Sequence, residues 1–138
     1  MKVLDQDALQ ALHALRAAER EQAQHYRDLI VRAEAAGATD VAERLSGLQA
    51  DEQHHFSRLT ARLLELGEEV ADPPPRARPP VAFEQWEAVS RAREADEVSR
   101  YRALLARPLD AVTAALAREI LDVELQHEKV LGGKWMCA

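Results

Sequence analysis

Apolar side chains recur every three or four residues along most of the chain, which is the spacing of one face of an α-helix. The pattern predicts four helices, at residues 5–36, 39–66, 83–106 and 108–131. Asp5 or Asp7 can cap the first helix, and Gly37 and Gly67 stand where glycine commonly ends a helix. Pro108 suits the start of the last helix, where a missing backbone N–H costs little.

The two middle helices are separated by residues 68–82, which begin with two glutamates and then become rich in proline. Proline fixes φ and removes backbone donors, so we predict an extended linker here. At about 3.1 Å per residue the linker reaches roughly 45 Å, the length of a helix of about thirty residues. The other connections are short and require antiparallel neighbours. We therefore predict one all-α domain over residues 1–138, a four-helix bundle of two antiparallel hairpins with a long crossover and a short tail at 132–138.

Composition and charge narrow the class of protein. The chain has 138 residues with 4% aromatics and a net charge of -6, which suits one soluble helical domain and argues against nucleic acid as a partner. No apolar run approaches the roughly eighteen residues that a membrane-spanning helix needs. The only cysteine, Cys137, leaves no disulfide framework and no cysteine-based metal site. We expect a cytoplasmic protein without a membrane partner.

The apolar faces are interrupted by acids and histidines in a repeated pattern. Two Glu-x-x-His motifs lie on the inner faces of the second and fourth predicted helices, at Glu52/His55 and Glu124/His127. On each preceding helix a glutamate stands seven residues before a tyrosine, at Glu19/Tyr26 and Glu94/Tyr101. We therefore interpret the chain as two copies of one helical hairpin, each of which supplies two carboxylates and one imidazole.

Four carboxylates on buried helix faces present an electrostatic problem. An unpaired buried carboxylate costs several kcal/mol, and the four would also repel one another. Two divalent cations would balance the four charges while both histidines stay neutral, and residues at i and i+3 lie close enough to reach one ion. Mixed oxygen and imidazole ligands suit iron or manganese better than tetrahedral zinc. The sequence thus predicts two iron ions, with manganese as the alternative metal, in the core of the bundle.

This arrangement resembles the ferritin-like di-iron carboxylate superfamily, which includes ferritins, bacterioferritins and rubrerythrins, over residues 5–131. The resemblance implies that Glu19 and Glu94 are terminal ligands and that Glu52 and Glu124 bridge the two ions. It also implies that each of the two histidines binds one ion.

Three further residues are candidates because of the same resemblance. Tyr26 and Tyr101 match tyrosines near the metals, where they hydrogen-bond ligands or pass electrons; the alternative is two ordinary core aromatics. Glu97 lies where rubrerythrin-like proteins use an additional glutamate for peroxide reduction, which makes it a seventh candidate ligand. The alternative for Glu97 is a half-exposed acid paired with Arg93 or Arg100.

Several features of the family are missing from this chain. It has no CxxC pairs of the kind found in a rubredoxin domain, so electrons would come from Fe(II) itself or from an external donor protein. Gln53 stands where bacterioferritins have a haem-binding methionine, so we expect no haem. Full ferritins are usually longer, which argues against iron storage in a shell, and a homodimer is only weakly indicated.

The predicted function is di-iron redox chemistry, in which Fe(II) is oxidised by O2 or H2O2 as in a ferroxidase or a rubrerythrin-like peroxidase. One alternative is a di-iron oxygenase, which would need an apolar substrate pocket beside the ions. Another is a metal-free helical interaction module whose acids face solvent or pair with arginines. Asp51 is expected to be solvated or to support a ligand, and His13 and His25 are expected to lie on the surface.

Overall fold

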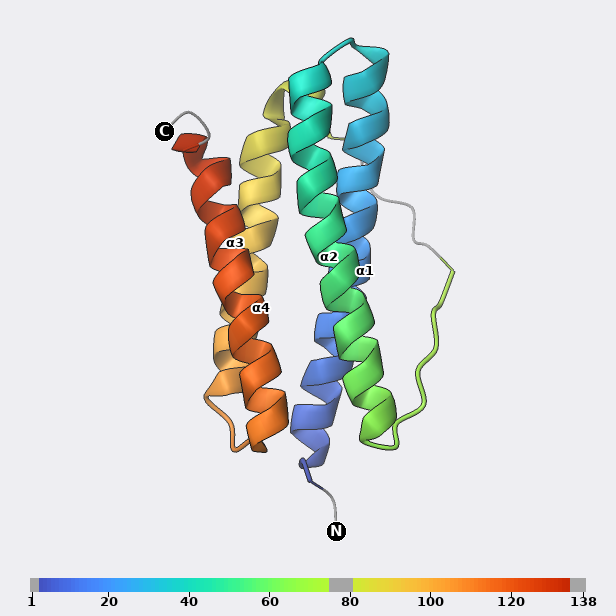
Figure 1. Cartoon of the computed structure of the whole chain (residues 1–138), viewed down its shortest axis with the longest axis vertical. Coiled ribbons are helices and arrows are strands. Elements are labelled where there is room, and N and C mark those ends of the chain that lie inside the picture. Colours follow the sequence, from blue (N-terminus) through green and yellow to red (C-terminus); the bar gives the residue numbers. More distant parts are fainter. Residues whose placement is uncertain (1–2, 75–80, 135–138) are drawn as a thin grey trace.

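A computed structural model of the protein describes residues 3–74 and 81–134. Its long helices are α1 (Gln6–Ala35), α2 (Thr39–Glu65), α3 (Trp86–Leu105) and α4 (Ala111–Lys129). A 3-10 turn, η1 (Phe83–Gln85), precedes α3, and a π-helical turn, η2 (Val130–Lys134), follows α4. The four long helices lie side by side in one bundle, which confirms the predicted fold class (Figure 1).

Side-chain caps and glycines set four of the eight ends of the long helices. The Asp5 carboxylate accepts a hydrogen bond of 2.8 Å from the backbone N–H of Ala8, so α1 begins where the sequence predicts. Gly37 and Gly67, with φ of 71° and 83°, follow α1 and α2 in a left-handed conformation that favours glycine. The predicted start of the last helix at Pro108 is wrong. The carboxylate of Asp110 accepts from the Thr113 N–H at 3.0 Å, and this cap starts α4 at Ala111.

The predicted tail at 132–138 starts within a helical turn. Helical backbone continues through η2 to Lys134, and the turn keeps Leu131 only 2% exposed in the core. The Arg91 side chain packs against Gly132, where an added Cβ would come within 3.1 Å of its Nε. The rest of the predicted tail, residues 135–138, lies outside the described part of the chain.

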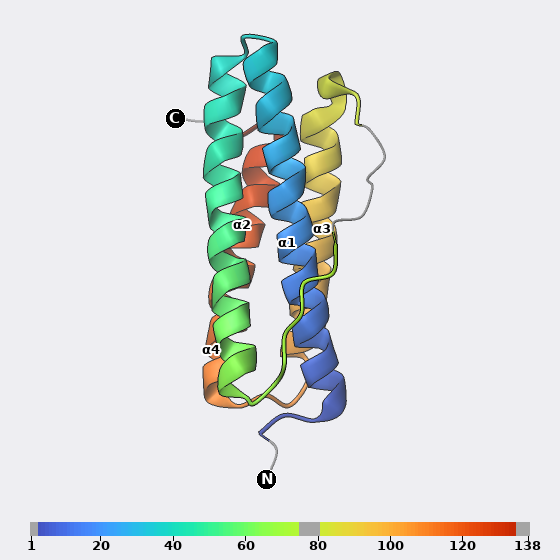
Figure 2. The same ribbon diagram turned by 90° about the vertical axis from the view of Figure 1, so that its right-hand side faces the viewer.

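The segment after α2 crosses α1 and leads to the opposite end of the bundle, where α3 begins (Figure 2). Basic side chains of α1 hold it in place. Arg16, itself 6% exposed, pairs with Asp72 at 2.8 Å, and Arg20 donates to the Pro73 carbonyl oxygen at 2.9 Å. The long crossover between two antiparallel hairpins is therefore confirmed, although residues 75–80 lie outside the described ranges.

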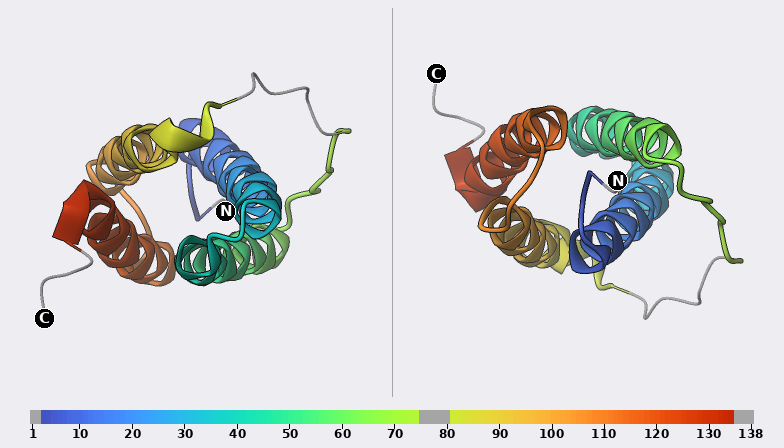
Figure 3. Two further views of the ribbon diagram at one scale, coloured as in Figure 1. Left: turned by 90° about the horizontal axis from the view of Figure 1, so that it is seen from above. Right: turned by 90° about the horizontal axis from the view of Figure 1, so that it is seen from below.

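Viewed from its ends, the bundle has its four helices arranged around a common centre (Figure 3). Two apolar clusters fill this centre at different heights. The first includes Leu12, Leu63 and Ile120, and the second includes Leu29 and Leu45; all five are at most 1% exposed. Burial of one such side chain contributes about 1.5–3 kcal/mol. None of the helices in the described part of the chain is long and apolar enough to span a bilayer.

Candidate metal centre

A layer of acidic and imidazole side chains separates the two apolar clusters. Each long helix contributes to it, because the inner face of each helix carries an acid or a histidine at this height, near the middle of α1, α2 and α3 and toward the end of α4. Relative exposures are 0% for the four glutamates, 2% for one histidine and 4% for the other; the six residues are Glu19, Glu52, His55, Glu94, Glu124 and His127. The structure therefore brings together all six residues that the two hairpin copies predict.

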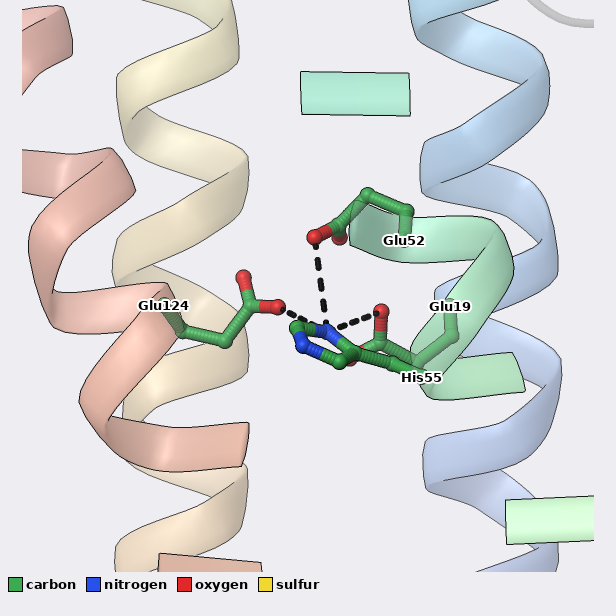
Figure 4. Close-up of side chains that lie close together, drawn as sticks. All are labelled: Glu19, Glu52, His55 and Glu124. Carbon is green, nitrogen blue, oxygen red and sulfur yellow. Dashed lines mark ion pairs between the residues drawn. The ribbon is translucent and has the colours of Figure 1, made fainter. Parts of the chain in front are cut away.

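The first of two groups in this layer surrounds the ring of His55. Its Nδ1 lies 2.8 Å from Glu124 Oε1, 3.5 Å from Glu19 Oε2 and 3.6 Å from Glu52 Oε1. The three carboxylates come from three different helices and point toward the imidazole (Figure 4). One ligand atom from each of the four residues lies within 4.8 Å of the others, a separation that one metal ion can bridge.

The second group surrounds the ring of His127. Its Nδ1 lies 3.3 Å from Glu52 Oε1, 3.4 Å from Glu94 Oε1 and 3.7 Å from Glu124 Oε2. These four residues also offer ligand atoms within 4.8 Å of one another. Glu52 and Glu124 belong to both groups, so the geometry suits two neighbouring ions that share two carboxylates.

Buried atoms without partners mark the places where cations would bind. Each of the six residues has at least one buried side-chain oxygen or nitrogen with no hydrogen-bond partner: Glu19 Oε2, both oxygens of Glu52, His55 Nδ1, Glu94 Oε2, both oxygens of Glu124 and His127 Nδ1. Such atoms cost about 1–3 kcal/mol each when nothing satisfies them. Carboxylate oxygens with imidazole nitrogens are ligands that divalent transition metals accept. The donor set therefore fits a pair of metal ions.

The pKa values of the carboxyl groups show that negative charge is unfavourable in this layer. Burial raises the pKa of Glu52 well above its usual value, and the charge of Glu19 raises it further. Burial and the neighbouring Glu124 raise the pKa of Glu94 to about 8. Burial acts the same way on Glu124, but contacts with Glu94 and with both histidines outweigh it and lower the pKa of Glu124. Without cations, protons on some of these carboxyl groups relieve the repulsion.

The histidines take up protons for the same reason. Burial alone would lower the pKa of His55, but the nearby carboxylates of Glu124 and Glu19 raise it to about 9. At His127 burial is again outweighed, mainly by a hydrogen bond to Asp51, and the pKa rises to about 12. In the metal-free protein both rings are therefore cationic at neutral pH, so protons occupy the place that metal charge would take.

The two tyrosines each hold a glutamate of the opposite hairpin. The Tyr26 hydroxyl donates to Glu94 Oε1 at 2.5 Å, and the Tyr101 hydroxyl donates to Glu19 Oε1 at 2.8 Å. Both side chains are 0% exposed, and burial together with the neighbouring glutamate raises each tyrosine pKa well above 10.0. They therefore lie beside the cluster as hydrogen-bond donors. Passage of electrons through them stays a prediction.

Glu97 is buried beside the cluster but outside both groups. It is 5% exposed, and its Oε2 has no partner among the described residues. Burial and the nearby Glu19 and Glu124 raise its pKa well above the usual value. The half-exposed acid considered as an alternative is therefore wrong, and Arg93 directs its Nε to Gln22.

Two predictions about residues outside the six have clear outcomes. Asp51 lies 2.7 Å from His127 Nε2, so it supports a cluster residue instead of being only solvated. His25 is 5% exposed and lies 2.8 Å from the Ser90 hydroxyl, so its predicted surface position is wrong. Partners on a neighbouring helix decide both cases, and only the three-dimensional packing reveals them.

Gln22 is a residue that the sequence analysis missed. It is 1% exposed, and its amide nitrogen donates to the Tyr26 hydroxyl at 3.0 Å and to Glu94 Oε1 at 3.2 Å. A signal for it was present in the sequence. Gln22 follows Glu19 by three residues, the same spacing that places Glu97 after Glu94.

The fold and this layer together define a ferritin-like four-helix bundle with a buried Glu/His di-metal motif. Among solved structures it is similar to bacterioferritin BfrA of Mycobacterium tuberculosis, with a TM-score of 0.85, 21% identity, and coverage of 95% of this chain and 85% of that one. It is also similar to the bacterioferritin-related protein of Bacteroides fragilis, a dodecameric thioferritin, with a TM-score of 0.83, 24% identity, and coverage of 95% and 86%. No family model and no curated protein matches the chain. The ferritin-like fold that the sequence resemblance implies is thus confirmed.

Proposed function

We propose that this protein binds two iron ions in the buried layer and oxidises Fe(II) with O2 or H2O2, as a ferroxidase or a rubrerythrin-like peroxidase. The observation that carries the proposal is the set of buried, unpartnered ligand atoms in two groups with two shared carboxylates. The likeness to a bacterioferritin and to a bacterioferritin-related protein supports iron as the metal.

In this proposal each residue of the layer has a defined task. Glu52 and Glu124, which belong to both groups, would help to hold both ions, and Glu19 and Glu94 would each help to hold one. His55 and His127 would each supply one imidazole nitrogen. Because these groups carry protons in the metal-free protein, binding of cations releases protons from the layer. The buried tyrosines keep the two terminal glutamates oriented.

The chemistry that bound iron supplies is the transfer of one electron from each of two Fe(II) ions. With H2O2 as oxidant, both electrons and two protons convert the peroxide into two molecules of water. With O2, the same two electrons and two protons yield H2O2. In a ferroxidase the iron is itself the substrate, whereas a peroxidase cycle needs an external donor protein to return the electrons.

Glu97 supports the peroxidase form of the proposal. A fifth carboxylate with an unpartnered oxygen lies next to the first group, where it can act as a further ligand or hold a proton for the oxidant. The alternatives have less support. An open groove of about 490 Å³ between α2 and α4 contains none of the six cluster residues in its lining, so it offers no substrate pocket for an oxygenase. The cluster acids are buried among histidines, which a solvent-facing interaction module would not require.

Anaerobic titration of the metal-free protein with Fe(II) tests the proposal. We expect two ions per chain, followed by ferric absorbance when O2 or H2O2 is added. Glu52→Ala and His127→Ala should abolish this stoichiometry, whereas Glu21→Ala, which removes an exposed acid of α1, should leave it intact. Glu97→Gln should slow the reaction with H2O2 more than that with O2. If Glu52→Ala and His127→Ala bind as much iron as the wild type, the site proposal fails.

A further inference from the structure

The two hairpins carry equivalent residues around the metal layer, so each position can be compared with its counterpart. The terminal glutamates correspond, and each accepts a hydrogen bond from the tyrosine of the other hairpin. The Glu-x-x-His motifs of α2 and α4 correspond in the same way. The bundle therefore has an approximate internal two-fold relation. Where this relation is broken, the two metal positions receive different support.

The first difference lies behind the two histidines. Asp51 precedes Glu52 on α2, and its carboxylate lies 2.7 Å from His127 Nε2. A carboxylate accepts here, so Nε2 carries the proton when the ring is neutral and Nδ1 presents its lone pair to the cluster. The equivalent residue before Glu124 is Val123, which has no polar side-chain atom. The ion pairs that the described residues make with His55 all involve its Nδ1.

The second difference lies beside the terminal glutamates. The amide nitrogen of Gln22 donates to Glu94, and its amide oxygen accepts from Arg93 Nε at 2.6 Å. This chain of bonds fixes the amide and orients the glutamate. The equivalent residue beside Glu19 is Glu97, which has no amide hydrogen to donate and keeps an unpartnered oxygen. Both differences favour the same metal position.

We infer that the two metal positions are unequal: the Glu94/His127 position, oriented by Asp51 and Gln22, binds its ion first and more tightly. The Glu19/His55 position exchanges its ion more readily. Ligands held in place before binding lose less conformational freedom when the ion arrives, and outer hydrogen-bond partners are worth about 10–100-fold in metal affinity. This inference rests on the proposed di-metal function.

Titration of the metal-free protein with Co(II) tests the inference without any redox reaction. Calorimetry and the Co(II) absorbance spectrum should show two binding steps in the wild type. The decisive comparison places Asp51→Val in two backgrounds, His55→Ala and His127→Ala, each of which retains one position. In the His55→Ala background Asp51→Val should weaken binding about tenfold and change the Co(II) spectrum, whereas in the His127→Ala background it should do neither.

Control variants separate this positioning role from a general loss of charge. Asp122→Val removes an exposed acid from α4 and should change neither background. Asp51→Asn keeps an oxygen that can accept from Nε2 and should restore part of the affinity. The converse variant, Val123→Asp, should strengthen binding in the His127→Ala background, a gain that misfolding cannot produce. Equal weakening by Asp51→Val in both backgrounds, or in neither, would overturn the inference. A wild-type protein that binds no Co(II) would instead refute the metal centre itself.

Discussion

Leu63 and Glu52 lie three helical turns apart on the same face of α2, and both are 0% exposed. The leucine gains stability from burial in every state of the protein, because its transfer from water is favourable by itself. The glutamate gains it only when a proton or a cation compensates its charge. The comparison shows that the apolar ends of the bundle hold the fold, while the polar layer makes part of its stability depend on what is bound.

Truncation of a side chain in an apolar end of the bundle should have the largest effect on stability, and this effect should not depend on metal. We expect Leu63→Ala to lower the free energy of unfolding by about 2–5 kcal/mol, equally with and without metal, because it leaves a cavity. Chemical denaturation of both forms measures this. The neighbouring Leu64 is 55% exposed, and Leu64→Ala should change stability by no more than about 0.5 kcal/mol. If the stability lost in Leu63→Ala depended on metal, the apolar ends and the polar layer would not contribute to stability independently.

Metal loading should have the next largest effect and should act through the polar layer alone. A site held at one hundred times its Kd stabilises the folded state by about 2.7 kcal/mol per ion. Thermal unfolding of the protein with Mn(II) should therefore show a marked rise in Tm over the metal-free form. Glu52→Gln removes a charge from both groups and should lose most of this rise while its metal-free form stays folded. An undiminished rise in this variant would contradict the role of the layer.

The pH dependence should be smaller, and its sign follows from the shifted groups. In the folded metal-free protein the pKa of Glu94 rises from 4.5 to about 8 and that of His55 from 6.5 to about 9. The folded state thus binds more protons than the unfolded state between about pH 4.5 and 9, so stability falls as pH rises through this window. Metal-loaded protein releases these protons on binding, so its Tm should exceed the metal-free value by more at pH 8 than at pH 6. A constant difference would show that the ions do not displace the protons.

The sequence was sufficient for the fold and for the six central residues for one physical reason. Helical periodicity fixes which side chains share a face, so Glu19, Glu52 and His55 could be placed on the core side from their spacing alone. The start of α4 was harder to predict from the sequence. The choice between Pro108 and Asp110 depends on a single capping bond, whose acceptor also pairs with an arginine of α2.

Contacts between helices account for the rest of what the sequence left open. Asp51 lies off the predicted inner face of its own helix. It contacts His127 only because α4 packs next to α2. Gln22 is an ordinary polar residue in the sequence until Arg93 and Glu94 of α3 are placed beside it. Such pairs depend on the rotation and separation of helices, which periodicity within one helix does not determine.

The crossover, which is held against α1, allows the two hairpins of this protein to differ in sequence. Two separate, identical hairpins could associate through the same two-fold contact, but symmetry would then force Asp51 and Val123 to be one residue. A covalent connection replaces that association with an effective concentration in the millimolar range, so pairing no longer depends on identical surfaces. Each half is then free to specialise. Within one short chain, a nearly symmetric architecture can thus give its two metal positions different neighbours.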